Sequence, residues 1–176
     1  MTDVVPVESD QRHDRAGGHP AARTPIHPRW THAPLGGVVF VAVFDALSAV
    51  AGSSRPWARD LYRSGTFVLS AMPALIGVAV ATGFADRARA TAAHARVRAR
   101  VNLHAAAMIA MALASAGNLA LRRVAYADGR HTPAAVLAVT VVALVAAVVG
   151  GDLGGRLTYR AGVGVRPQAS STRSAG

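Results

Sequence analysis

The sequence predicts an all-α fold, an integral membrane bundle of four transmembrane helices with disordered polar termini. Hydrophobic residues make up 52% of its 176 residues, and the mean hydropathy is +0.30. The apolar residues fall in four blocks, at about 35–52, 65–85, 101–121 and 132–151, in which Asp45 is the only formal charge. About 20 apolar residues at 1.5 Å rise cross a hydrocarbon core of roughly 30 Å. Surface helices of soluble proteins carry a polar face, so four membrane spans are predicted.

The segments outside the blocks predict three regions. Residues 1–25 are rich in charge, glycine and proline and are expected to form a disordered cytoplasmic tail. Residues 26–165 form the transmembrane domain, and 166–176 a flexible C-terminal tail. No cleavable signal peptide is expected, because the first apolar block begins only at Leu35. The chain has no cysteine, which excludes disulfides and thiolate metal sites.

Arginine placement predicts the orientation. All 19 basic residues are arginine, and 13 precede the first block, separate the second from the third, or follow the fourth. The other connections hold six: Arg55, Arg59, Arg63, Arg122, Arg123 and Arg130. By the positive-inside rule, both termini are expected in the cytoplasm of a cell with this protein in its inner membrane. The net charge of +10 also predicts attraction to anionic membrane lipids. Nucleic acid is not an expected partner, because no basic stretch carries interleaved aromatic residues.

This topology brings scattered titratable residues to the cytoplasmic face. They are His27, His32, Asp86, His94, His104 and Asp152. We expect His32, Asp86, His104 and Asp152 to meet in one polar cluster. Two interpretations of the segment HPRWTHAPLG, residues 27–36, remain open. Its prolines, Pro28 and Pro34, could keep the segment out of a regular helix and set the angle at which the chain enters the membrane, or its imidazoles could bind a metal, a haem edge or a ligand head group.

The third block carries a stripe of soft and polar residues. His104, Met108, Met111, Ser115 and Asn118 follow at steps of 4, 3, 4 and 3, which places them on one helix face. Such a face is expected to turn away from lipid. Histidine and methionine can hold haem iron or copper, but methionines at this spacing are more often packing residues. Glycines 150, 151, 154 and 155 end the fourth block and predict close helix packing.

Asp45 lies near the middle of the bilayer. A central aspartate costs about 2.5–3.5 kcal/mol on insertion scales, so it is expected to face protein. Three hydroxyl residues lie at similar depth, and we predict that they donate to its carboxylate: Ser70, Ser115 and Thr140. The resulting polar layer could fix the helix register, or it could serve as a proton or ion relay.

No nucleophile elbow, phosphate-binding glycine loop or HExxH motif is present.

The segments HPRWTHAPLG, FDALS, GFAD, VNLHA and GGDLGGRLTYRAGVGV occur in this order between His27 and Val165. This pattern resembles the domain-of-unknown-function 2231 family of bacterial four-helix membrane proteins. Some members of that family are joined to Rieske-type iron–sulfur domains, which implies a redox setting for those relatives. Where the family commonly has tyrosine, any residue, histidine and then GVGV, this chain has Tyr159, Arg160, Ala161 and Gly162.

The sequence therefore supports two functional hypotheses. The first is a redox-linked membrane subunit that binds haem or quinone near the cytoplasmic face through His32, His104 and either His27 or His94, with an electron-transfer protein as partner. The alternative is a non-catalytic membrane protein that is structural, binds a partner or forms a homo-oligomer. A small transporter depending on Asp45 is a third reading. Which metal, if any, the site would hold does not follow from the residues.

Overall fold

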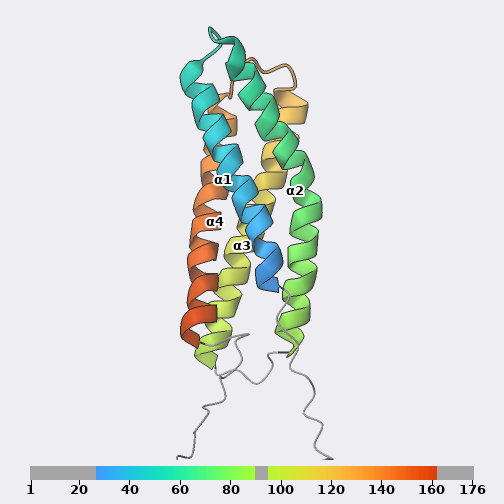
Figure 1. Ribbon diagram of the computed structural model, residues 1–176, viewed down its shortest axis with the longest axis vertical. Helices are drawn as coiled ribbons and strands as arrows, with labels where there is room; N and C mark the ends of the chain where they lie inside the picture. The colour runs from blue at the N-terminus through green and yellow to red at the C-terminus, as the bar shows by residue number, and fades with distance from the viewer. Residues whose placement is uncertain (1–26, 90–94, 162–176) are drawn as a thin grey trace, which may run out of the picture.

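Four long helices account for most of the computed structural model, which describes residues 27–89 and 95–161. They are α1 (His27–Ala51), α2 (Pro56–Arg89), α3 (Ala95–Ala125) and α4 (Ala134–Ala161). Neighbouring helices run antiparallel, and the α1–α2 and α3–α4 connections lie at the same end of the bundle, at the top of Figure 1. We call this the turn end. The described residues contain no strand, and the predicted all-α class is confirmed.

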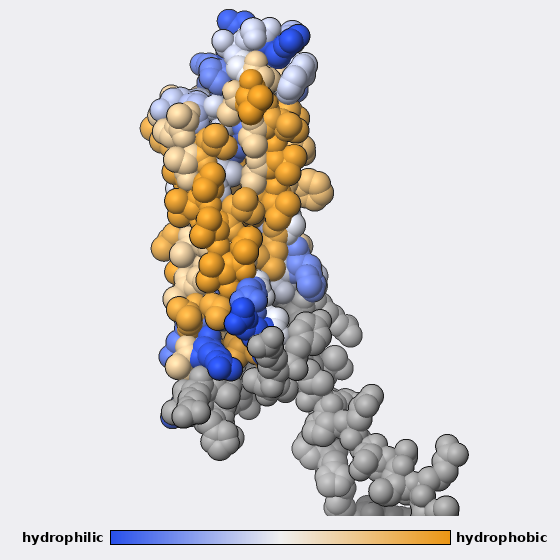
Figure 2. All heavy atoms as spheres, turned by 90° about the vertical axis from the view of Figure 1, so that its left-hand side faces the viewer, coloured by the Kyte–Doolittle hydropathy of each residue, from blue (hydrophilic) through white to orange (hydrophobic). Residues whose placement is uncertain are grey.

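All four helices are long and apolar enough to cross a membrane, over Trp30–Ala51, Pro56–Phe84, Arg98–Ala125 and Ala134–Leu157. Each of these segments is longer than the corresponding predicted block, because helical hydrogen bonding continues through the polar residues at the block ends. Figure 2 shows an apolar belt between two polar ends on the face that it presents. Large apolar side chains such as Phe40 and Leu113 point outward, 61% and 68% exposed. Lipid rather than water is the solvent that suits such a surface.

The expectation that Pro28 and Pro34 keep their segment out of a regular helix is wrong. Helix α1 begins at His27 and contains Pro34, which is fully buried. Pro28 falls in the first turn, where backbone N–H groups have no partner within the helix. Pro34 removes only one hydrogen bond, close to the helix start, and its ring adds apolar surface to the interior.

The bundle consists of two helical hairpins. Contacts are most extensive within the pairs α1–α2 and α3–α4, fewer between α1 and α4, and fewest between α2 and α3. Helices α1 and α3 therefore lie diagonally opposite each other. The α2–α3 side is the most loosely packed of the four lateral contacts.

A serine joins the two hairpins at the turn end. The hydroxyl of Ser48 in α1 donates to the Ala58 carbonyl of α2 at 2.7 Å. The same oxygen accepts the backbone N–H of Thr132, in the α3–α4 connection, at 3.0 Å. In the α1–α2 connection, Gly52 turns the chain with a φ of 64°, a conformation that glycine adopts without strain. Both connections are thus held together through one buried side chain.

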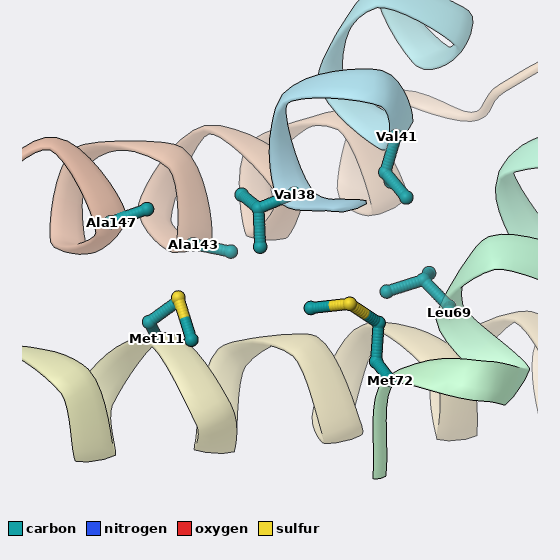
Figure 3. Close-up of a cluster of buried hydrophobic side chains, with 7 residues drawn as sticks. All are labelled: Val38, Val41, Leu69, Met72, Met111, Ala143 and Ala147. Atoms are coloured by element: carbon teal, nitrogen blue, oxygen red, sulfur yellow. The ribbon is translucent and has the colours of Figure 1, made fainter. Parts of the chain in front are cut away.

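Below this end, the core is formed by apolar side chains from all four helices (Figure 3). It contains Val38, Val41, Leu69, Met72, Met111, Ala143 and Ala147. Both methionines are almost fully buried and extend into the space between the helices. The surroundings of Met111 are aliphatic, which favours the packing interpretation of the methionine stripe.

We predict that Met111→Ala lowers the free energy of unfolding by about 2–3 kcal/mol. This is the lower part of the range for buried methionine truncations, since lipid is as apolar as the core and lost packing dominates. Leu113→Ala, on the outer face of the same helix, is the matched control, with an expected loss below about 1 kcal/mol. Equilibrium unfolding in mixed micelles measures both. Equal losses for the two variants would contradict the assigned core.

Candidate functional site

A buried ion pair occupies the bundle interior near the turn end. Asp45 of α1 is 0% exposed and forms a salt bridge with Arg122 of α3, which is 1% exposed. Two hydroxyl groups complete the surroundings of the carboxylate. The hydroxyl of Thr140 in α4 donates to Oδ2 at 2.6 Å, and that of Thr132 donates to Oδ1 at 3.1 Å. The carboxylate therefore has three donors, each from a different segment.

The guanidinium of Arg122 is surrounded as completely. Its Nε–H donates to Oδ1 of Asn118, one turn earlier in α3, at 2.7 Å. Its Nη1 donates to the Tyr62 carbonyl at 3.0 Å and to the Thr66 hydroxyl at 3.2 Å, both in α2. The guanidinium also lies 4.7 Å from the centre of the Tyr62 ring, a cation–π contact. Four of its five N–H groups have protein acceptors, which is what a buried arginine needs.

Asn118 and Thr140 close the network into a ring. The Asn118 amide donates to Oγ1 of Thr140 at 2.7 Å, and it also lies 3.4 Å from the Val136 carbonyl. Thr140 has only one hydroxyl proton, and its distance to Asp45 is shorter than the 3.0 Å to the Val136 carbonyl. The ring thus runs from Asp45 to Arg122, Asn118, Thr140 and back. A closed ring of donors and acceptors satisfies two charges inside a low-dielectric interior.

Glycine at position 65 allows α2 to approach this pair. A Cβ there would lie 3.3 Å from Nη1 of Arg122 and 3.4 Å from Oδ1 of Asp45. The distance to Arg122 is tighter than an ordinary contact and the distance to Asp45 is at the lower limit of one, and both charged groups are held by their partners. Residue 65 therefore has little room for a side chain, and all four helices contact the ion pair or its ligands.

Of the three hydroxyl donors predicted for Asp45, only Thr140 contacts it. Ser70 is exposed, donates to the Thr66 carbonyl at 2.8 Å and accepts from Arg123 at 2.9 Å. Ser115 is buried, but its hydroxyl has no hydrogen-bond partner among the described residues. The expectation that these two serines donate to Asp45 is therefore wrong. Counting residues along a span gives the depth of a side chain in the membrane but not the rotation of its helix.

At the opposite end, His104 joins α3 to α4. Its Nδ1–H donates to the Gly150 carbonyl at 2.8 Å. A Cβ at Gly154 would lie 3.0 Å from the ring, and one at Gly150 would lie 2.6 Å from Sδ of Met108. Of the four glycines expected to allow close packing, Gly150 and Gly154 therefore lie where the two helices approach, whereas a Cβ at Gly151 or Gly155 would meet nothing within 4 Å.

The other predicted site residues lie apart from the ring around Asp45 or outside the described residues. His32 is exposed on α1, and Asp152 is exposed and paired with Arg156 at 2.8 Å. The side chains of His27 and Asp86, and the whole of His94, lie outside the described residues. Among the residues that are described, no group of three or more histidine, aspartate or glutamate side chains could hold a metal ion. The joint cluster of His32, Asp86, His104 and Asp152 stays a prediction.

Comparison with known protein families finds a match over most of the chain. A family described as "Predicted membrane protein (DUF2231)" matches residues 23–167. The chain belongs to this family. The resemblance drawn from its motifs is confirmed, and the match covers all four spans of the DUF2231 bundle. No curated protein and no solved structure matches the chain.

Sequence reasoning missed the partner of Asp45. Arg122 was counted with the loops because it follows the apolar block that ends at Leu121, whereas the structure places it inside α3. A signal was present, since Arg122 is four residues after Asn118 and continues the stripe that begins at His104 by one more step. An arginine in register with an inward face is the natural counter-ion of an intramembrane aspartate.

We predict that breaking the ion pair is costly and that removing it whole is less so. Asp45→Asn leaves Arg122 buried without a counter-charge, and Arg122→Met leaves Asp45 buried without one. Each single variant should lower the free energy of unfolding by about 3–5 kcal/mol. The double variant should lose clearly less than the sum of the two. Unfolding in mixed micelles measures this cycle.

The control for this cycle is Ser115→Ala, which removes a buried hydroxyl without a partner. Its unfolding free energy should equal or exceed that of the unmodified chain. Wild-type stability of Asp45→Asn, or strict additivity in the double variant, would show that the pair does not hold the bundle together.

Proposed function

We propose that this DUF2231 protein is a non-catalytic membrane protein whose intramembrane polar residues join its helices. The observation that carries this proposal is the closed ring around Asp45. In this ring the carboxylate accepts from three donors, and four N–H groups of Arg122 have protein acceptors. A proton or ion relay needs a group that can exchange partners, so full engagement favours a fixed structural role over a small transporter. Its function then lies in contacts with membrane lipids, a second copy or a partner protein.

The proposal includes an orientation, with both termini on the cytoplasmic side of an inner membrane. Because Arg122 is buried in α3, the turn end retains five of the six arginines first assigned to it, against 13 on the other side. The charge asymmetry that supports cytoplasmic termini therefore increases.

Single cysteines test this orientation cleanly, since the chain has none of its own. Ser53→Cys lies exposed in the α1–α2 connection, and Arg98→Cys lies exposed at the other end. In intact cells, a membrane-impermeant maleimide should label position 53 and leave position 98 unlabelled until the membrane is permeabilised. The reverse pattern would place the termini outside.

A redox-linked subunit that binds haem or quinone is a second candidate, and one contact favours it. The Nδ1–H of His104 is directed to a backbone carbonyl, the arrangement that often orients a ligating histidine. His32, His27 or His94 would have to supply the second ligand of a haem. This candidate has one histidine contact in support, whereas the structural proposal has the whole ring.

One substitution separates the two candidates. In His104→Asn the amide nitrogen takes the place of Nδ1 and can still donate to Gly150, but the Nε2 position is lost. A structural histidine predicts an unfolding free energy within about 1 kcal/mol of the unmodified chain for Asn, and a loss of about 1–3 kcal/mol for His104→Leu.

The cofactor measurement uses the purified, detergent-solubilised protein. Under the structural proposal its oxidised and dithionite-reduced spectra contain aromatic absorption alone. A Soret band that shifts on reduction and disappears in His104→Asn would instead establish the redox candidate. Quinone binding is followed separately, by extraction and chromatography of the bound lipid fraction.

A further inference from the structure

A basic groove opens between α2 and α3 at the turn end. Its volume is about 750 Å³, within the range of ligand sites, and it lies on the side where neighbouring helices pack least. Its lining combines an exposed aromatic ring with basic and hydroxyl side chains. Phe67 of α2 is 77% exposed, while Arg63 and Arg123 are exposed nearer the turns.

The two exposed arginines of the groove carry uncompensated charge. Across residues 27–89 and 95–161, neither Arg63 nor Arg123 has a carboxylate within ion-pair distance, although Arg123 donates one N–H to Ser70. Arg122 lies behind them, but Asp45 neutralises it. Tyr126 also lines the groove and contributes a phenolic hydroxyl that can donate. Arginine forks and a hydroxyl donor together suit a phosphate group.

We propose that this groove binds one anionic phospholipid, with its phosphate between Arg63 and Arg123 and an acyl chain against Phe67. The position argues for a lipid rather than a soluble anion. Its lining residues lie between the exposed apolar surface at Phe67 and the polar turn end, the level at which phosphates and the first methylenes of lipids are expected. Basic sites between membrane helices recognise anionic head groups in this way.

The test is native mass spectrometry of the full chain, freed of lipid in detergent and titrated with dioleoylphosphatidylglycerol, with dioleoylphosphatidylcholine as the uncharged comparison. The first anionic lipid should bind at least about tenfold more tightly than the zwitterionic one. Sodium phosphate at millimolar concentration should not displace it.

Paired variants locate the site. The double variant Arg63→Gln/Arg123→Gln should lose the preference for the anionic lipid. The matched control Arg55→Gln/Arg59→Gln removes two exposed arginines at the same end but outside the groove, and it should keep the preference. Because the lipid comparison is made on the unmodified protein, it decides even where a variant folds poorly.

Three outcomes would overturn the proposal. Equal affinity for both lipids would show that charge is not recognised. An equal loss in both double variants would reduce the effect to the general charge of this end. Displacement by sodium phosphate would identify a site for a soluble anion instead of a lipid.

Discussion

The buried ion pair between Asp45 and Arg122 is the constraint on which the bundle depends. Each residue alone would be a charge in a hydrocarbon layer, and together they connect two helices that are otherwise not neighbours. Every further contact at this level follows from satisfying them: Thr132 and Thr140 for the carboxylate, and Asn118 with Tyr62 and Thr66 for the guanidinium. Even the glycine at position 65 is explained by the space that the pair occupies. The relative rotation of all four helices is therefore fixed at one depth.

The two ends of the bundle are held in different ways. At the turn end, charge and hydrogen bonds dominate, with Ser48 linking both connections. At the other end, α3 and α4 approach through glycines, and His104 contributes one hydrogen bond to a carbonyl. Between them lies an aliphatic core in which Met72 and Met111 fill the space. Moving an apolar side chain from lipid into the core supplies little driving force for helix association. The apolar core therefore contributes close packing, and the polar contacts determine which helix faces meet.

The fold was predictable because it follows from block length and hydropathy, which are properties of single segments. The site was predictable only in part. The inward orientation of Asp45 and the contact with Thr140 could be reasoned from desolvation cost and depth. Ser70 and Ser115 lie at a similar depth, but the rotation of their helices does not direct them toward Asp45. Arg122 was missed because an arginine at a block boundary is indistinguishable from a loop charge until the helix is known to continue. Likewise Pro34 was expected to interrupt a helix, yet an early position made its lost hydrogen bond tolerable.

The division of the ion pair between hairpins has a consequence for biogenesis. Asp45 belongs to the α1–α2 hairpin and Arg122 to the α3–α4 hairpin, so neither hairpin can neutralise its own charge while it enters the bilayer. Each would carry an insertion penalty of about 2.5–3.5 kcal/mol until the other arrives. Docking of the two halves then pairs the two charges in one step, so the same contact that offsets part of both penalties also joins the two hairpins.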